Sequence, residues 1–182
     1  MKPNTIAWLV IGWCVCIALL FAVRAPADVP TLAERVALVA PSVGSRRETI
    51  VPPPDFGAAI AAATPSREWA AFLVTVASHE SALSERIARS DCREHECDGG
   101  RAWGLWQQHR TVQNAADWGS PDLIVQARHA SKLARGYYNM CRDSGVPFPL
   151  STFRAYAGRG CFQPLKGEGE RMATYRRVLR QL

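Results

Sequence analysis

Glu80 is the residue whose type and position most directly suggest chemistry. It lies in the segment Trp69–Leu83, where apolar residues recur at helical spacing. At about 100° per residue, the side of the helix that carries Glu80 is otherwise apolar: Trp69, Phe72, Leu73, Val76, Ala77, Leu83 and Ile87. A carboxyl group in apolar surroundings tends to keep its proton, and such an acid can protonate a leaving group. The alternative is a salt bridge in which an arginine from another helix neutralises Glu80.

Two further segments combine aromatic, glycine and amide residues. Residues 102–107 read Ala-Trp-Gly-Leu-Trp-Gln, and residues 155–160 read Ala-Tyr-Ala-Gly-Arg-Gly. In order and spacing, these segments and the pair Glu80-Ser81 resemble the lysozyme-like lytic transglycosylases, the soluble lytic transglycosylase family that is related to goose-type lysozymes. That family shows Glu-Ser on a helix, then Gly-Leu-Met-Gln, then Ala-Tyr-Asn-Ala-Gly. The resemblance covers residues 65–180 and implies a lysozyme-like helical domain that cleaves peptidoglycan.

The resemblance implies a role for each matching residue. Glu80 corresponds to the catalytic acid, Ser81 to its hydroxyl neighbour, and Tyr156 to an aromatic residue near the catalytic carboxyl. The segment that lines the glycan groove corresponds to Gly104, Leu105, Trp106 and Gln107. This chain departs from the family pattern where Trp106 replaces Met and where no Asn separates Tyr156 from Ala157. The loop between the first two motifs is also longer than usual, so the departures concern the shape of the groove more than the acid.

The mechanism depends on how many carboxylates take part. Cleavage of a glycosidic bond needs a proton on the departing oxygen, and ordinary glycosidases use a second carboxylate as well. The acidic residues closest to Glu80 in sequence lie in one loop, where most carboxylates are simply solvated: Asp91, Glu94, Glu96 and Asp98. One carboxyl suffices if the N-acetyl group of the substrate stabilises the developing charge and Glu80, once ionised, deprotonates the 6-hydroxyl of the sugar.

The resemblance therefore implies non-hydrolytic cleavage between N-acetylmuramic acid and N-acetylglucosamine, with 1,6-anhydro products and with Glu80 as acid and then base. No metal or organic cofactor is expected. Two alternatives stay open. One is hydrolysis, as in lysozyme, and the other is a catalytically inactive module that binds peptidoglycan.

Several residues near the motifs have two interpretations. Trp103 and Trp106 could stack on sugar rings or pack in the core. The polar residues that follow could bind acetamido and hydroxyl groups or form a solvated end: Gln107, Gln108 and His109. His79 points about 100° away from Glu80 on the helix, which argues against a catalytic dyad. The C-terminal arginines are expected to form a solvated face: Arg171, Arg176, Arg177 and Arg180.

The elements that must position these residues are predicted to be helices. Thr64 is a suitable N-cap and Pro65 suits the first position of a helix that would run to about Ser90. Further helices are expected over 120–145, over 151–156 and from 168 onward. No strand pattern with alternating polarity is visible, so the body, residues 65–182, is predicted to be all-α.

The N-terminus carries an uncharged apolar run, Ile6–Val23, which is long enough to span a bilayer. We expect residues 1–24 to be an uncleaved signal anchor in the inner membrane, with one membrane pass and the body in the periplasm or outside the cell. The alternative is a signal peptide that is cleaved near Ala27, which would give a secreted protein. Residues 25–64 are rich in proline and are expected to be a linker. Short helices at 31–40 and 56–63 could form within it, but neither could fold alone.

The body contains four cysteines: Cys92, Cys97, Cys141 and Cys161. An even number after an export signal favours two disulfides. Cys92–Cys97 would close a short loop and Cys141–Cys161 would tie a helix end to a later segment, although other pairings stay open. The rival interpretation is a metal site made by Cys92, His95 and Cys97, but this spacing matches no common zinc pattern.

The chain is basic, with a net charge of +6 and a pI of about 9.3. A basic surface suits an anionic polymer such as nucleic acid, acidic lipid or a cell-wall glycan that carries peptide carboxylates, but it can also serve solubility alone. No nucleic-acid-binding motif is visible, so nucleic acid is not an expected partner. The expected partners are peptidoglycan strands and, through residues 6–23, the membrane. Secretion, conjugation and phage assembly are all open as biological settings.

Overall fold

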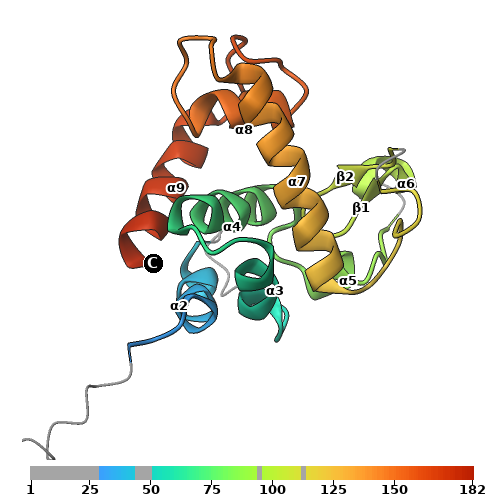
Figure 1. The fold of residues 1–182 in the computed structure, drawn as a ribbon. Coiled ribbons are helices and arrows are strands. Elements are labelled where there is room, and N and C mark those ends of the chain that lie inside the picture. The colour runs from blue at the N-terminus through green and yellow to red at the C-terminus, as the bar shows by residue number, and fades with distance from the viewer. Residues whose placement is uncertain (1–28, 44–50, 94–95, 112–113) are drawn as a thin grey trace, which may run out of the picture. The chain divides into compact units, whose positions relative to one another are not determined.

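A computed structural model of the chain describes residues 29–43, 51–93, 96–111 and 114–182. The predicted membrane helix at 6–23 and the cleavage site near Ala27 lie outside these residues, so both stay predictions. Within the described ranges, no helix is both long enough and apolar enough to cross a bilayer. Thr31–Leu182 form one compact unit that is built mainly of helices (Figure 1).

The central element is α4 (Arg67–Ser81), which carries Glu80 in its last turn. Ser66 begins this helix, because its side-chain oxygen accepts a hydrogen bond from the backbone N–H of Trp69. All residues from 70 to 78 are buried, so other elements cover α4 on every side and not along one stripe only. Glu80 therefore follows closely after this buried part of α4.

This helix is shorter than the sequence predicted. The chain leaves α4 at Ala82, which adopts a left-handed conformation with a φ of 50°, and then forms α5 (Glu85–Ala88). The single helix predicted over 64–90 is thus wrong at both ends. The apolar spacing was misleading because Leu83 is fully buried although it lies in the turn after α4 and not in a continuing helix. Glu80 consequently lies near a helix end, where a cleft can reach it.

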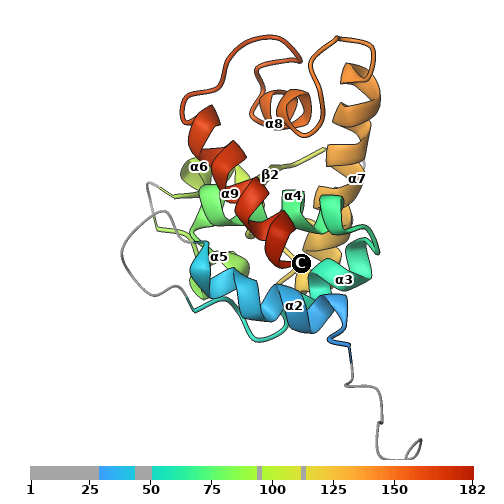
Figure 2. The same ribbon diagram turned by 90° about the vertical axis from the view of Figure 1, so that its left-hand side faces the viewer.

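Three later helices surround α4. Asp122 begins α7 (Leu123–Cys141), since its carboxylate accepts hydrogen bonds from two backbone N–H groups of the first turn. The chain continues with α8 (Leu150–Tyr156) and α9 (Glu168–Gln181). α9 packs across α4, and α8 packs on α7 (Figure 2). These helices agree with the predicted ones, except that α7 ends before the turn at Gly145.

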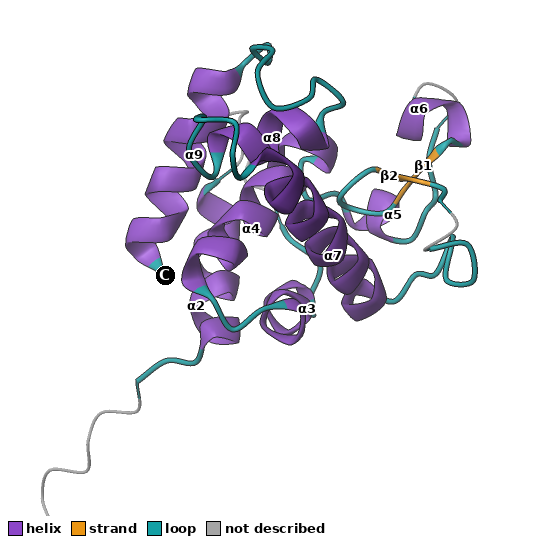
Figure 3. Ribbon diagram, turned by 45° about the horizontal axis from the view of Figure 1, so that its top comes forward, coloured by secondary structure: helices purple, strands orange, loops and turns teal. Residues whose placement is uncertain are grey.

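A small lobe lies on the opposite side of α7 from α9 (Figure 3). It contains α5, the tight turn α6 (Cys97–Gly100) and an antiparallel hairpin of β1 (Ala102–Trp103) and β2 (Gln108–His109). The hairpin was not predicted, because strands of two residues are too short to show alternating polarity. The all-α prediction is confirmed as a mostly helical fold, to which the hairpin is a small addition.

Both predicted disulfides are present. Cys92–Cys97 closes the loop that leads into α6, and Cys141–Cys161 ties the end of α7 to the segment after α8. The sulfurs of Cys92 and Cys97 are bonded to each other, so they are not thiolate ligands for the rival metal site. His95 lies outside the described residues, and among those described no cluster of three or more His, Cys, Asp or Glu is placed to hold a metal ion.

Part of the predicted linker belongs to the core. α2 (Leu32–Val39), which continues into a 3-10 turn (Ala40–Ser42), packs against α3 (Phe56–Ala63), and α3 packs against α7 (Figure 1). Their buried side chains are Val36, Val39, Ala40, Val43, Phe56, Ala59 and Ile60. The linker prediction for 25–64 is therefore wrong for residues 31–43 and 51–64. Neither helix could fold alone, but each completes the apolar core beside α4.

Gly57 marks the closest approach of α2 and α3. A Cβ atom at this position would lie 2.3 Å from the backbone oxygen of Ala33. We expect Gly57→Ala to lower the free energy of unfolding by about 1–3 kcal/mol, because backbone cannot move aside without separating the two helices. Urea denaturation measures this change. Gly136→Ala in α7 is the control, since a Cβ there meets open space and alanine should raise helix stability by up to about 1 kcal/mol. Equal midpoints for Gly57→Ala and wild type would contradict this packing.

Candidate active site

A cleft of about 780 Å³ opens beside the last turn of α4. Side chains from α4, the lobe, α7, α8 and α9 line it: Glu80, Ile87, Glu96, Cys97, Asp98, Gln107, His109, Tyr137, Tyr156, Ala157, Gly158 and Arg171. Each of the three sequence motifs contributes to this wall, with Glu80 from the first, Gln107 from the second and Tyr156 from the third. Residues that are distant in sequence thus meet in one cavity.

Glu80 is partly exposed in this cleft and is ion-paired. Its Oε1 accepts a hydrogen bond from Nη1 of Arg171 on α9 at 2.7 Å, and the two side chains are 25% and 15% exposed. The expectation of an unpaired carboxyl in apolar surroundings is therefore wrong, and the salt-bridge alternative is confirmed. The expected solvated face of arginines is also wrong for Arg171, whereas Arg176 and Arg180 are exposed. Helical spacing alone could not have identified Arg171 as the partner of Glu80, because the two residues lie on different helices.

Tyr156 presents a neutral phenol to the same cleft. Its hydroxyl donates a hydrogen bond to the carbonyl oxygen of Trp106 at 3.0 Å, and its ring lies edge-on to Tyr137. Burial raises the pKa of Tyr156 well above 10, and the negative charge of Glu80 raises that pKa further. The phenol of Tyr156 therefore keeps its proton and stays neutral at physiological pH.

The hairpin brings only one of the four expected groove residues to the cleft. Gln107, at the turn, has a φ of 47°, and its side-chain amide donates to the carbonyl oxygen of Gly104 at 2.9 Å. Leu105 and Trp106 are fully buried, so the prediction that they line the groove is wrong. The Trp106 indole stacks on Phe56 and donates to a backbone oxygen of α4 at 2.9 Å, which makes it a core residue. Gly104 packs against a side chain of α7 instead of a ligand.

Trp103 is likewise a core residue of the lobe and not a sugar-stacking surface. It is 1% exposed, and its indole N–H donates to the carbonyl oxygen of Ser120 at 3.0 Å. Its ring contacts Trp118 and His129. Of the polar residues that follow, Gln108 is buried, whereas His109 is exposed at the cleft.

Two neighbours of Glu80 in the sequence do not face the cleft. The hydroxyl of Ser81 is buried and donates to the carbonyl oxygen of Ala77 at 2.8 Å, so its predicted substrate contact is wrong. His79 lies 3.3 Å from the hydroxyl of Thr174 on α9, away from the cleft, as the helical wheel indicated. Burial lowers the pKa of His79, and the positive charge of Arg171 lowers it further. Neither neighbour therefore contributes a side chain to the cleft wall beside Glu80.

Gln126, on α7, holds the hairpin in place and was missed in the sequence. This fully buried side chain donates from Nε2 to the carbonyl oxygens of Ala88 at 2.6 Å and Ser120 at 3.0 Å. Its Oε1 accepts a hydrogen bond from the backbone N–H of Leu105 at 3.1 Å. One amide therefore joins the end of α5, the hairpin and the start of α7. The available signal was a glutamine beside Ala127 on the apolar face of a predicted helix.

The acidic loop supplies two carboxylates to the cleft wall. Glu96 accepts hydrogen bonds from Arg86 at 2.5 Å and from the backbone N–H of Arg93 at 2.8 Å, and these bonds hold the pKa of Glu96 below its usual value. Asp98 lies 3.1 Å from the imidazole of His109. Asp91 is not part of the wall, and Glu94 lies outside the described residues. Asp98 is thus the better placed of the two for any role beside Glu80.

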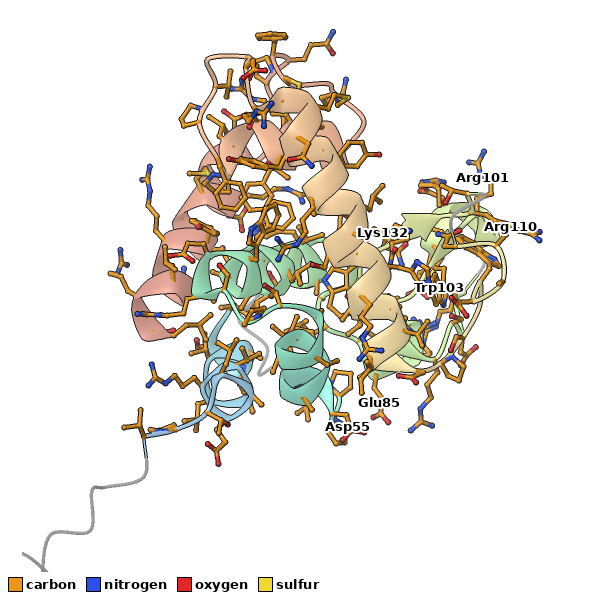
Figure 4. All side chains as sticks on the ribbon, in the orientation of Figure 1. Asp55, Glu85, Arg101, Trp103, Arg110 and Lys132 are labelled. Atoms are coloured by element: carbon orange, nitrogen blue, oxygen red, sulfur yellow. A yellow bond between two sulfur atoms is a disulfide. The ribbon has the colours of Figure 1, made fainter. Side chains whose placement is uncertain are left out.

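A second hollow, of about 350 Å³, lies along α7. It is lined by side chains of α7 and of the segment after the hairpin, including Lys132, which lies on the side of α7 toward the lobe (Figure 4). Tyr137 lines this hollow as well as the cleft. Arg101 and Arg110 extend from the outer edge of the lobe (Figure 4). A ligand that follows α7 would therefore meet both cavities, which suits an extended molecule.

No protein-family model, curated protein or solved structure matches this chain. The chemistry of the cleft is consequently the basis for assigning a function. That chemistry comprises one ion-paired carboxyl at a helix end, a neutral phenol, an amide side chain and two loop carboxylates.

Proposed function

We propose that this protein is a lysozyme-like lytic transglycosylase that cleaves peptidoglycan between N-acetylmuramic acid and N-acetylglucosamine. The observation that carries the proposal is the meeting of Glu80, Gln107 and Tyr156 in one cleft. Transfer of a proton to a glycosidic oxygen needs a carboxyl group that is positioned within hydrogen-bond reach of that oxygen. The mostly helical body is consistent with the helical domain that the sequence resemblance implies.

In this mechanism Glu80 acts twice. As an acid it gives its proton to the departing oxygen, and the bond to the anomeric carbon breaks while positive charge develops on the sugar. As a carboxylate it then accepts the proton of the sugar's own 6-hydroxyl, whose oxygen bonds to the anomeric carbon. The product is a 1,6-anhydro sugar, Glu80 is protonated again, and no water is consumed. Gln107 and Tyr156 would orient the reacting sugar through hydrogen bonds.

Hydrolysis is the second candidate activity, and the position of Asp98 in the same wall favours it. Lysozymes pair the acid with a second carboxylate that acts as a nucleophile or activates water. Glu96 is less suited to this role, because Arg86 and a backbone N–H already compensate its charge. An inactive binding module is the third alternative, and the ion pair between Glu80 and Arg171 is the contact that favours it.

The proposal includes export of the body from the cytoplasm. Disulfides form and persist in oxidising compartments, and the two disulfides support such a location. Together with the apolar run at 6–23, they favour a single-pass anchor in the inner membrane with the body in the periplasm or outside the cell. Secretion after cleavage near Ala27 is the alternative. In either case the cell wall is the adjacent anionic polymer for a chain of net charge +6.

Product analysis tests the proposed reaction. We expect the full chain, incubated with purified peptidoglycan, to release fragments with 1,6-anhydro ends, because a sugar hydroxyl and not water attacks the anomeric carbon. Mass spectrometry identifies each such end, since it is lighter by one water than a reducing end. Products with reducing ends only would replace this reaction with hydrolysis. A failure to release any fragment would refute cleavage of peptidoglycan.

A further inference from the structure

The ion pair between Glu80 and Arg171 creates a chemical conflict within the proposed function. A general acid must hold a proton, but Arg171 donates a hydrogen bond to Oε1 of Glu80 at 2.7 Å. A guanidinium at this distance stabilises the carboxylate, and it does not lose its own proton in proteins. In this arrangement Oε1 of Glu80 is occupied by Arg171 and is not free to present a proton to a glycosidic oxygen. Catalysis needs another partner for Arg171 before the glycosidic bond can be protonated.

The cleft itself offers no such partner. Among the described residues that line it, Arg171 is the single arginine or lysine, and the other carboxylates already have partners of their own. Glu96 is paired with Arg86, and Asp98 lies beside His109. A new anion for Arg171 must therefore come with the substrate.

Peptidoglycan carries such anions close to the bond that is cleaved. N-acetylmuramic acid bears a lactyl ether, which ends either in a free carboxylate or in a peptide with carboxylates of its own. A carboxylate is the preferred partner of a guanidinium, because two parallel hydrogen bonds can form between them. Chemically, an incoming carboxylate can compete directly with Glu80 for the same Nη1 donor.

We propose, resting on the function above, that Arg171 recognises a carboxylate of the muramic acid unit and exchanges Glu80 for it. Once released, Glu80 takes up a proton from the solvent and becomes the acid. Arg171 is in this sense a specificity-determining residue that couples the charge of the substrate to the protonation of Glu80. Neutral glycans leave the ion pair intact and are poor substrates.

The test compares three forms of one glycan: peptide-free strands with lactyl carboxylates, peptide-bearing strands, and strands whose carboxylates have been converted to methyl amides. We expect Arg171→Gln to slow cleavage of the anionic strands about tenfold or more relative to the amidated strands, since a hydrogen bond to a charged group is lost. Arg171→Lys, which keeps the charge, should retain part of the preference. Arg176→Gln is the matched control, because Arg176 is an exposed residue of the same helix. The anionic strand whose faster cleavage is lost in Arg171→Gln shows whether Arg171 recognises the lactyl carboxylate or a peptide carboxylate.

A binding measurement tests the same exchange without catalysis. In Glu80→Gln the competing carboxylate is gone, so calorimetry should show about tenfold tighter binding of anionic than of amidated strands. Adding Arg171→Gln should remove this difference. Equal affinities in Glu80→Gln, or equal slowing of all three strands by Arg171→Gln, would overturn the inference and leave Arg171 with a structural role. The proposed function fails separately, if wild type cleaves no strand or if Glu80→Gln cleaves as fast as wild type.

Discussion

Replacing Glu80 with glutamine is expected to lower the rate of fragment release from peptidoglycan by about a thousandfold, which lies within the range that general acid–base catalysis contributes. The amide keeps the size of the side chain and can still accept the hydrogen bond from Arg171. It can neither donate a proton to the glycosidic oxygen nor accept one from the 6-hydroxyl. Initial rates measured by chromatography of the released fragments, with thermal unfolding as a check on folding, give the result.

The matched control for this experiment is Glu85→Gln. Glu85 is an exposed glutamate on α5 that forms an ion pair with Arg89 and does not line the cleft. Loss of an exposed ion pair costs at most about 1 kcal/mol, so this variant should cleave at the wild-type rate. If Glu80→Gln and Glu85→Gln release fragments equally fast, Glu80 is not the acid, and Glu96 and Asp98 are the carboxyl groups of the cleft wall that remain.

Gly104→Ala is expected to have the largest effect on stability. Gly104 has a φ of 67°, which costs an alanine about 1–2 kcal/mol, and its Cβ would lie 2.2 Å from Oε1 of Gln126. The glutamine would have to move, and its buried backbone partners would lose their hydrogen bonds at about 1–3 kcal/mol each. We expect the free energy of unfolding to fall by about 4 kcal/mol in urea denaturation.

Gly145→Ala separates the two contributions to this effect. Gly145 has a similar φ of 75°, but a Cβ there meets no atom within 4 Å. Its replacement should therefore show the backbone cost alone, about 1–2 kcal/mol. Should the two variants lose the same stability, the contact between Gly104 and Gln126 is not the reason for glycine at position 104. Because the hairpin carries Gln107, Gly104→Ala is also expected to reduce the cleavage rate under conditions in which the variant is still folded.

Local patterns predicted the helices well where a cap or an apolar face lies within one element. The helix predicted from residue 120 begins at Leu123 with Asp122 as its N-cap, and such a cap can be anticipated because it acts on N–H groups two or three residues away. The end of α4 was not predictable in this way. Leu83 continues the helical spacing beyond Ser81, although the left-handed conformation of Ala82 ends the helix. A leucine that is buried in a turn and one that is buried on a helix face give the same apolar spacing in the sequence.

The aromatic residues of the second motif illustrate a different limit. Trp103 and Trp106 had equal claims to a sugar surface and to the core, because an amphipathic ring suits both. Their indole N–H groups bond to backbone oxygens of Ser120 and Leu73, which are far away in sequence, and both rings are buried. These distant hydrogen-bond partners show that both tryptophans belong to the core, and the spacing of residues within the motif could not have indicated those partners.

By itself, the sequence predicted the helical body, favoured two disulfides and marked Glu80, Gln107 and Tyr156 through three motifs, since each of these depends on residue type and local spacing. Only the tertiary structure decided that Arg171 is the partner of Glu80 and that α2 and α3 belong to the core. The physical reason is the same in both cases. An ion pair or a buried helix face stabilises the protein through contacts between distant segments, and a local pattern does not specify which distant segments will meet.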